Sequence, residues 1–140
     1  AQYVPDKLVV KMPSETALIL CTVLRKLGIN AHYSITHPNH PATKWAGASR
    51  ANMQWLKDHG IALCQEYTRR YGRRHACQDI IENIEIPEFL PEERTPFAQC
   101  MPKEYRDNDA VAAYRNYMIK EKTYYARWKL GNKPKWWANV

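Results

Sequence analysis

The sequence predicts an all-α fold that forms one compact domain. Three observations support this prediction. Apolar residues recur at three- and four-residue intervals over long stretches, prolines gather in one segment, and no stretch alternates apolar and polar residues as a half-buried strand does. The chain has 140 residues, of which 45% are hydrophobic, and this is enough for one core. We therefore expect residues 1–140 to form a single helical domain, with at most a minor hairpin.

The first helix is predicted over residues 14–27. Ser14 is a typical N-cap residue, Glu15 suits the positive end of a helix, and apolar residues follow at helical spacing until Gly28. Residues 6–12 are expected to add one or two helical turns upstream, with Pro13 as a kink or a first-turn residue.

The longest periodic segment, residues 43–71, predicts a long central helix or two abutting helices, because Gly60 weakens its middle. Asn52, His59 and Glu66 interrupt its apolar face. We expect these three side chains to form a satisfied core network rather than a polar pocket. A basic turn over residues 69–74 and a short helix over residues 75–83 follow.

The C-terminal third is predicted as an extended segment followed by a helix and a tail. Four prolines between residues 85 and 102 exclude a regular helix, so we expect this segment to wrap over the surface. Asp107 or Asn108 is expected to cap the last helix, which carries Val111, Tyr114 and Met118 at helical spacing. A tail rich in cations and aromatic residues then ends the chain.

The charge of the chain indicates a polyanionic partner. Lys and Arg number 21 against 14 Asp and Glu, which gives a formal net charge of +7. Double-stranded DNA is the leading candidate, although an anionic membrane surface or a phosphorylated ligand would be attracted too. We expect a monomer, with contacts to other chains through the Pro-rich segment and the tail as an alternative.

The same sequence predicts a soluble cytoplasmic protein. No apolar run approaches the roughly 20 residues that span a bilayer, and the N-terminus lacks an apolar leader. The four cysteines stand singly, as in a reducing compartment. His37 and His40 have a spacing that a metal could accept, but no third ligand is evident, so we expect no metal and no cofactor.

Two basic regions are candidates for contact with nucleic acid. Interleaved cations and aromatics suit backbone tracking and base stacking, but aromatic residues also anchor tails, and arginines at a helix end also complement the helix dipole. The candidates, with the loop residue His40, are Arg69, Arg70, Arg73, Arg74, Arg127, Trp128, Lys129, Lys133, Lys135 and Trp136.

One carboxylate lies close in sequence to two amines. Glu15 follows Lys7 and Lys11, and an amine beside an acid is the minimal set for Schiff-base chemistry at a sugar carbon. A glutamate in this position is more commonly just a favourable partner of the helix dipole.

With these residues located, the chain resembles the phage-type pyrimidine-dimer DNA glycosylases, the T4 endonuclease V-like family. The resemblance rests on Asp6-Lys7 ahead of Met12 and Glu15, the loop that ends at His40, a helix with Trp45, Trp55, Leu63 and Glu66, and the tail through Trp128 and Trp136. It implies a helical enzyme that bends DNA, flips a base, attacks with an N-terminal amine and nicks by β-elimination, without a metal. Glu15 matches the catalytic glutamate by position, and a phage-encoded enzyme would act in the cytoplasm of the infected bacterial cell.

The chain departs from that family at three places. Ser14 and Thr16 stand where arginines flank the glutamate, Leu8 stands where a histidine is expected, and Ala1 lies closer to Glu15 than the amine does in the family. Either the first residues are missing, or the nucleophile differs, or the fold is used without lyase activity. Lys7 and Lys11 are the candidate replacement amines.

Overall fold

The structure is a computed structural model that describes residues 1–137. Five α-helices form in this range: α1 (Asp6–Lys26), α2 (Pro41–Gly47), α3 (Arg50–Tyr71), α4 (Gln78–Glu82) and α5 (Ala110–Lys122). Two 3₁₀ turns, η1 (Lys103–Tyr105) and η2 (Lys135–Trp137), complete the elements. No strand occurs among these residues, so the predicted all-α class is confirmed. None of the helices in residues 1–137 combines the length and hydropathy that crossing a bilayer requires.

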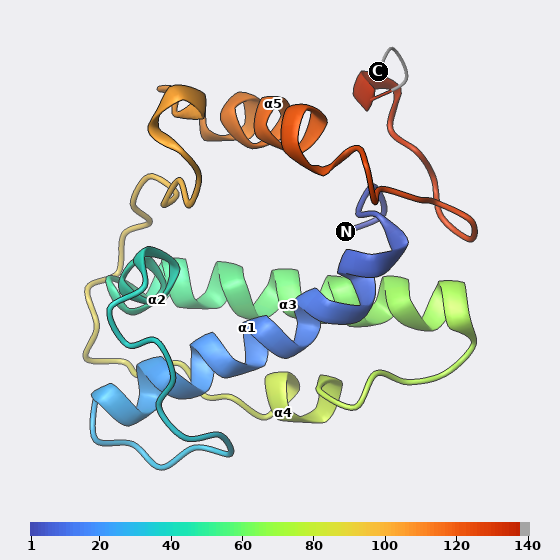
Figure 1. Ribbon diagram of the computed structural model, residues 1–140. Coiled ribbons are helices and arrows are strands. Elements are labelled where there is room, and N and C mark those ends of the chain that lie inside the picture. Colours follow the sequence, from blue (N-terminus) through green and yellow to red (C-terminus); the bar gives the residue numbers. More distant parts are fainter. Residues whose placement is uncertain (138–140) are drawn as a thin grey trace.

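The elements form two layers (Figure 1). Helices α1 and α3 cross and pack with α2 and α4 into the larger layer, while α5 and the C-terminal tail lie above them. The core of the larger layer contains Leu20, Met53 and Ile81, each with no exposed surface. The first residues and the tail lie together at one side of the molecule, where the two layers meet.

Helix α1 is longer than its predicted core segment and runs through Pro13 without ending. Pro13 lies inside the helix and is buried, so it is neither a first-turn residue nor a helix boundary. Proline removes one backbone donor and crowds the carbonyl four residues earlier. Burial of its ring in the core offsets part of this cost. The N-cap position is Pro5 rather than Ser14.

Gly60 lies within α3 and does not interrupt it. A Cβ atom at this position would lie 2.7 Å from Cγ2 of Thr16 in α1 and 3.2 Å from Cδ1 of Ile81 in α4. Only glycine allows three helices to approach so closely here, and this packing offsets its poor helix propensity.

The long periodic segment is instead divided at Ala48 and Ser49. Ser49 has extended backbone dihedrals, and its hydroxyl accepts a hydrogen bond from the backbone N–H of Asn52, which caps α3. His40 caps α2 in the same way, because its Nδ1 accepts from the backbone N–H of Ala42. The division therefore follows from N-capping and not from the glycine.

The Pro-rich segment carries no regular helix between Asn83 and Pro102, as predicted. It crosses the larger layer and leads through η1 to α5 (Figure 1). The cap of α5 is Asp109, whose carboxylate accepts from the backbone N–H groups of Val111 and Ala112. The predicted caps, Asp107 and Asn108, were two residues and one residue too early, respectively. The Asp107 carboxylate accepts from the Asp109 N–H instead.

Candidate functional site

Glu15 and Lys11 form an ion pair on the surface of α1. Nζ of Lys11 lies 3.2 Å from Oε1 of Glu15, and their side chains are 63% and 42% exposed. Glu15 also lines a depression of about 320 Å³ together with His37 and His40. The fold thus brings Glu15 beside Lys11 and His40, which are candidates from two separate parts of the sequence.

Lys7 lies one helical turn before Lys11, with a different neighbour. Its Nζ is 5.2 Å from the centre of the Tyr125 ring, a cation–π contact between α1 and the upper layer. The amine of Lys7 is therefore close to the junction of the layers, whereas that of Lys11 is paired with the carboxylate.

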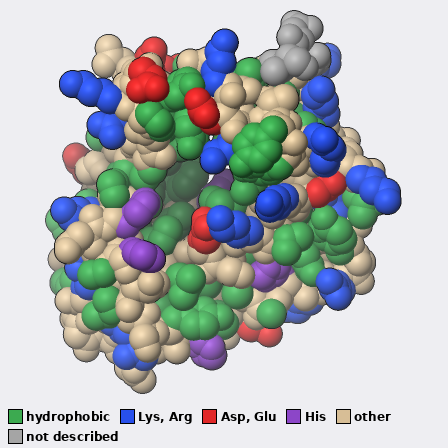
Figure 2. Space-filling view, in the orientation of Figure 1, with side chains coloured by type: hydrophobic (Ala, Val, Ile, Leu, Met, Phe, Trp, Pro, Cys, Tyr) green, Lys and Arg blue, Asp and Glu red, His purple; other side chains and the backbone are tan. Residues whose placement is uncertain are grey.

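A cavity of about 330 Å³ lies between the two layers. Its walls come from the start of α1, from α3, α5, the Pro-rich segment and the tail. Six aromatic residues contribute to them: Tyr3, Trp55, Phe97, Tyr114, Trp136 and Trp137. Figure 2 shows a hollow between the layers with hydrophobic walls, histidine side chains along one edge, and an acidic and a basic side chain close together beside it. Its volume is at the lower end of the range for small-molecule sites, roughly 300–1,000 Å³.

Leu8 connects this cavity to the ion pair, because it lines the cavity and lies on the same helix. Seven residues make almost two turns, so Leu8 and Glu15 point within about 20° of each other and lie roughly 10 Å apart along the axis. The ion pair and the cavity therefore occupy one face of α1.

The three polar residues on the apolar face of α3, Asn52, His59 and Glu66, differ in their hydrogen-bond partners. Asn52 is fully buried and bonds Trp45 O, Thr95 Oγ1 and Thr95 N, so it ties α3 to the Pro-rich segment. Glu66 accepts hydrogen bonds from Arg69 and Arg70. The expected satisfied network is thus correct for Asn52 and Glu66.

His59 differs, because no hydrogen bond to its ring is found within residues 1–137. Its ring stacks on Trp55 with centroids 4.9 Å apart. Burial lowers the pKa of His59 from 6.5 to about 4, so the imidazole is neutral at pH 7. Its ring packs against Trp55, which lines the cavity.

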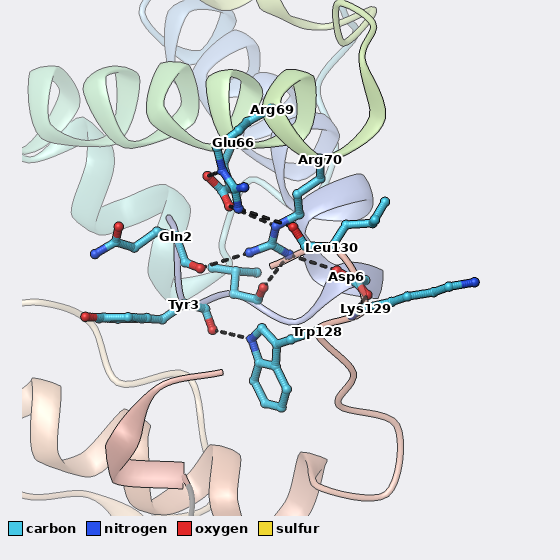
Figure 3. Close-up of polar contacts among 10 residues, drawn as sticks. Gln2, Tyr3, Asp6, Glu66, Arg69, Arg70, Trp128, Lys129 and Leu130 are labelled. Atoms are coloured by element: carbon cyan, nitrogen blue, oxygen red, sulfur yellow. Dashed lines mark hydrogen bonds and ion pairs between the residues drawn. The ribbon is translucent and has the colours of Figure 1, made fainter. Parts of the chain in front are cut away.

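Arg70 is the centre of a buried clasp that ties the first residues and the start of α1 to α3 (Figure 3). Its guanidinium, with no exposed side-chain surface, donates to Glu66 at 2.9 Å, to Val4 O at 2.7 Å, to Asp6 at 3.2 Å and to Gln2 O at 3.0 Å. Hydrogen bonds from Arg69 and then Arg70 lower the pKa of Glu66. Since Arg70 is enclosed, it is not placed to contact DNA, and the expectation of a phosphate contact from this residue is corrected.

The clasp continues into the C-terminal tail. The Lys129 N–H donates to Asp6 at 2.7 Å, and Trp128 Nε1 donates to Tyr3 O at 2.9 Å. Arg69 also reaches Leu130 O. Nothing in the sequence pairs positions so far apart, although Asp6 is the first residue of the helix that carries Lys7, Lys11 and Glu15.

The other arginines of the cluster lie on the surface but have partners. Arg73 donates to the hydroxyl of Tyr67 and lies over its ring, while Arg74 pairs with Asp79 and Glu82. The Arg74 side chain is 52% exposed, so its charge reaches solvent. Two carboxylates therefore neutralise part of the charge of Arg74, whereas Arg73, whose partner is a neutral phenol, keeps its full charge at the surface.

The tail separates its aromatic and cationic residues. Trp137 is buried, and the Trp128 and Trp136 rings pack against it. The tail cations Arg127, Lys129, Lys133 and Lys135 are exposed, and cations gather on this side of the molecule in Figure 2. The aromatic residues thus anchor the tail, which was one of the two alternatives, while the cations remain available to a polyanion.

Comparison of the chain with protein-family models, with curated proteins and with solved structures found no match. Within residues 1–137, no group of three or more His, Cys, Asp or Glu side chains is arranged to hold a metal ion.

Proposed function

We propose that this protein is a DNA glycosylase that acts on damaged or modified pyrimidines and carries an associated abasic-site lyase step. The observation that carries the proposal is the Lys11–Glu15 contact, on the same face of α1 as the wall of an aromatic cavity. The net charge of +7 and the exposed tail cations supply the attraction to the phosphate backbone.

The chemistry requires an amine and a carboxylate within reach of one sugar carbon. A Lys11 ammonium must first lose a proton, and Glu15 at 3.2 Å is placed to accept it. The free amine then attacks C1′, the C1′–N bond breaks, and the base leaves with the bonding electrons and takes the proton that Glu15 accepted. Opening of the sugar ring yields a protonated Schiff base. Glu15 then removes a C2′ proton and the C3′–O bond breaks with loss of the 3′ phosphate, which is the β-elimination step. Hydrolysis of the Schiff base by water releases Lys11. Lys7 is the alternative amine, since it lies one turn away on α1.

Borohydride trapping tests this proposal. Labelled duplexes that carry a thymine dimer, an abasic site or a modified pyrimidine are incubated with the protein and the reductant, and a covalent adduct is sought. Lys11→Arg keeps the positive charge beside Glu15 but removes the nucleophilic amine, so it is expected to lower adduct yield at least about tenfold. Lys7→Arg makes the same comparison at the second amine, and Lys103→Arg, on the exposed turn η1, serves as the matched control.

The trapping outcomes separate the assignments. Loss of the adduct in Lys11→Arg alone supports Lys11, and loss in Lys7→Arg alone transfers the role to Lys7. An adduct that persists in the double variant contradicts both, and peptide mapping then locates the amine that reacts.

A second candidate function, a non-catalytic nucleic-acid binding module, is favoured by the position of the exposed cations. Arg127, Lys129, Lys133 and Lys135 follow the tail and do not depend on the Lys11–Glu15 pair. Binding that weakens steeply with salt, with no adduct and no base release on any substrate, would establish this function instead.

A further inference from the structure

The wall of the cavity between the layers exposes no polar surface. Two of the polar side chains that line it turn their hydrogen-bonding atoms elsewhere: Trp137 Nε1 donates to the Thr123 hydroxyl at 3.0 Å, and the Tyr114 hydroxyl donates to Ala98 O at 2.7 Å. A polar group that entered the cavity would lose its hydration and find no partner on the wall, which is unfavourable. The cavity therefore suits an occupant whose enclosed part is apolar.

The size and the rings of the cavity narrow the class of occupant. An engineered apolar cavity of about 150 Å³ holds benzene, so this cavity of about 330 Å³ has room for two fused rings. In its wall, the Trp55 and Phe97 rings meet edge to face with centroids 4.7 Å apart, and the Trp136 and Trp137 rings stack at 5.3 Å. Aromatic pairs in such arrangements gain more than their buried area alone provides. An aromatic occupant is therefore favoured over an aliphatic one of similar size.

Arg115 on α5 is the one charged residue that lines the cavity within residues 1–137. Because the wall exposes no polar surface, the stem of Arg115 lines the cavity and its guanidinium lies outside, with Cζ 5.1 Å from the centre of the Trp136 ring. The residue is exposed, and no ion pair to it is found in the same range. The guanidinium is thus available to bind a carboxylate through two parallel hydrogen bonds.

We propose that this cavity is a binding site for a small aromatic carboxylate with two fused rings. The rings fill the apolar space, and the carboxylate stays at the mouth beside Arg115, in contact with water. Neither Lys11 nor Glu15 lines the cavity, so the site goes beyond the proposed function and does not depend on it.

Calorimetric titration of the full chain tests the class of ligand. The probes 2-naphthoate, 2-naphthamide and 2-naphthylmethylamine share one ring system and differ in charge, while decanoate keeps the carboxylate on an aliphatic chain. We expect naphthoate to bind with a Kd below about 1 mM. At low salt it should bind about three- to fivefold more tightly than the amide, and the protonated amine should bind more weakly than the amide. Decanoate should bind at least about twofold more weakly than naphthoate.

Two variants assign the binding to this cavity and to its arginine. Ala110→Leu fills part of the cavity, because Ala110 lines it, and should weaken naphthoate binding at least about fivefold. Ala112→Leu is the matched control, since Ala112 is exposed on the same helix and does not line the cavity. Arg115→Gln keeps most of the stem and removes the charge, so naphthoate and naphthamide should then bind within about twofold of each other. Thermal unfolding of each variant verifies that it folds.

Each outcome bears on one part of the proposal. Equal weakening in Ala110→Leu and Ala112→Leu places the ligand elsewhere and overturns the site. Equal binding of naphthoate and naphthamide, or a difference that persists in Arg115→Gln, overturns the carboxylate, and tighter binding of decanoate overturns the aromatic class. No binding of any probe overturns the proposal as a whole. Weakening in Ala110→Leu alone, with the charge preference lost in Arg115→Gln, supports it.

Discussion

Replacement of Arg70 with methionine is expected to destabilise the fold strongly. The Arg70 side chain has no exposed surface and makes four hydrogen bonds that join α3, the first residues and the start of α1. Methionine fills similar space but leaves Glu66, whose side chain is only 9% exposed, with Arg69 alone. Removing one partner of a buried ion pair costs about 3–5 kcal/mol. For a chain of this length, such a loss lowers Tm by roughly 10–17 °C.

Urea denaturation followed by circular dichroism measures this change. A matched control is Arg74→Met, which removes an arginine from a solvent-exposed pair and is expected to move the denaturation midpoint little. The double variant Arg70→Met/Glu66→Gln should lose at least about 1 kcal/mol less stability than the two single variants lose together. The reason is that Glu66→Gln removes the carboxylate charge that Arg70→Met leaves without its partner. A loss below about 1 kcal/mol in Arg70→Met would refute the role of Arg70 in holding the first residues and the start of α1 against α3.

Three further predictions test the packing and titration described above. Gly60→Ala should destabilise the protein by about 1–3 kcal/mol in urea denaturation despite the better helix propensity of alanine, and adding Thr16→Ser, which removes the methyl group at 2.7 Å, should recover part of the loss. The folded-state pKa of His59 is lowered from 6.5 to about 4, so the unfolded chain takes up a proton at this residue before the folded protein does. The contribution of His59 to the free energy of unfolding is therefore fully present above pH 6.5 and is lost as the pH drops towards 4. His59→Phe should flatten the pH–stability curve between pH 6.5 and 4, and an unchanged curve would contradict the lowered pKa of His59. Gly131→Ala places a Cβ 2.5 Å from Cζ of Arg70. Because four hydrogen bonds hold the Arg70 guanidinium in place, the tail must move away, and amide hydrogen exchange in the tail should accelerate. Unchanged protection of the tail amides from exchange would show that the tail accommodates the methyl group without loosening.

Local patterns in the sequence predict most of the helices. Apolar spacing locates α1, α3 and α5, and the proline density locates the extended segment. The errors arise where tertiary packing overrides local preference. Pro13 continues α1 because its ring is buried, and Gly60 sits in mid-helix because Thr16 and Ile81 leave room for no side chain. Neither contact can be inferred from neighbours in sequence.

The candidate site likewise has one part that the sequence predicts and another that only the folded structure shows. The Lys11–Glu15 pair follows from a four-residue helical spacing and is visible in the sequence. The interlayer cavity is not, because its wall combines Tyr3, Trp55, Phe97 and the tail, which only the packing of two layers brings together. Arg70 looks like its exposed neighbours in the sequence, and its burial depends on carbonyls more than sixty residues away.

The most direct test of the proposed function is single-turnover release of the base by the unmodified protein and by Glu15→Gln. The duplex carries one thymine dimer or one modified pyrimidine, and Glu92→Gln, which alters an exposed ion-paired carboxylate outside the cavity, is the control. We predict that Glu15→Gln slows release by about 10²–10⁴-fold while Glu92→Gln does not. Release at an equal rate in Glu15→Gln and the unmodified protein would contradict the catalytic role of Glu15.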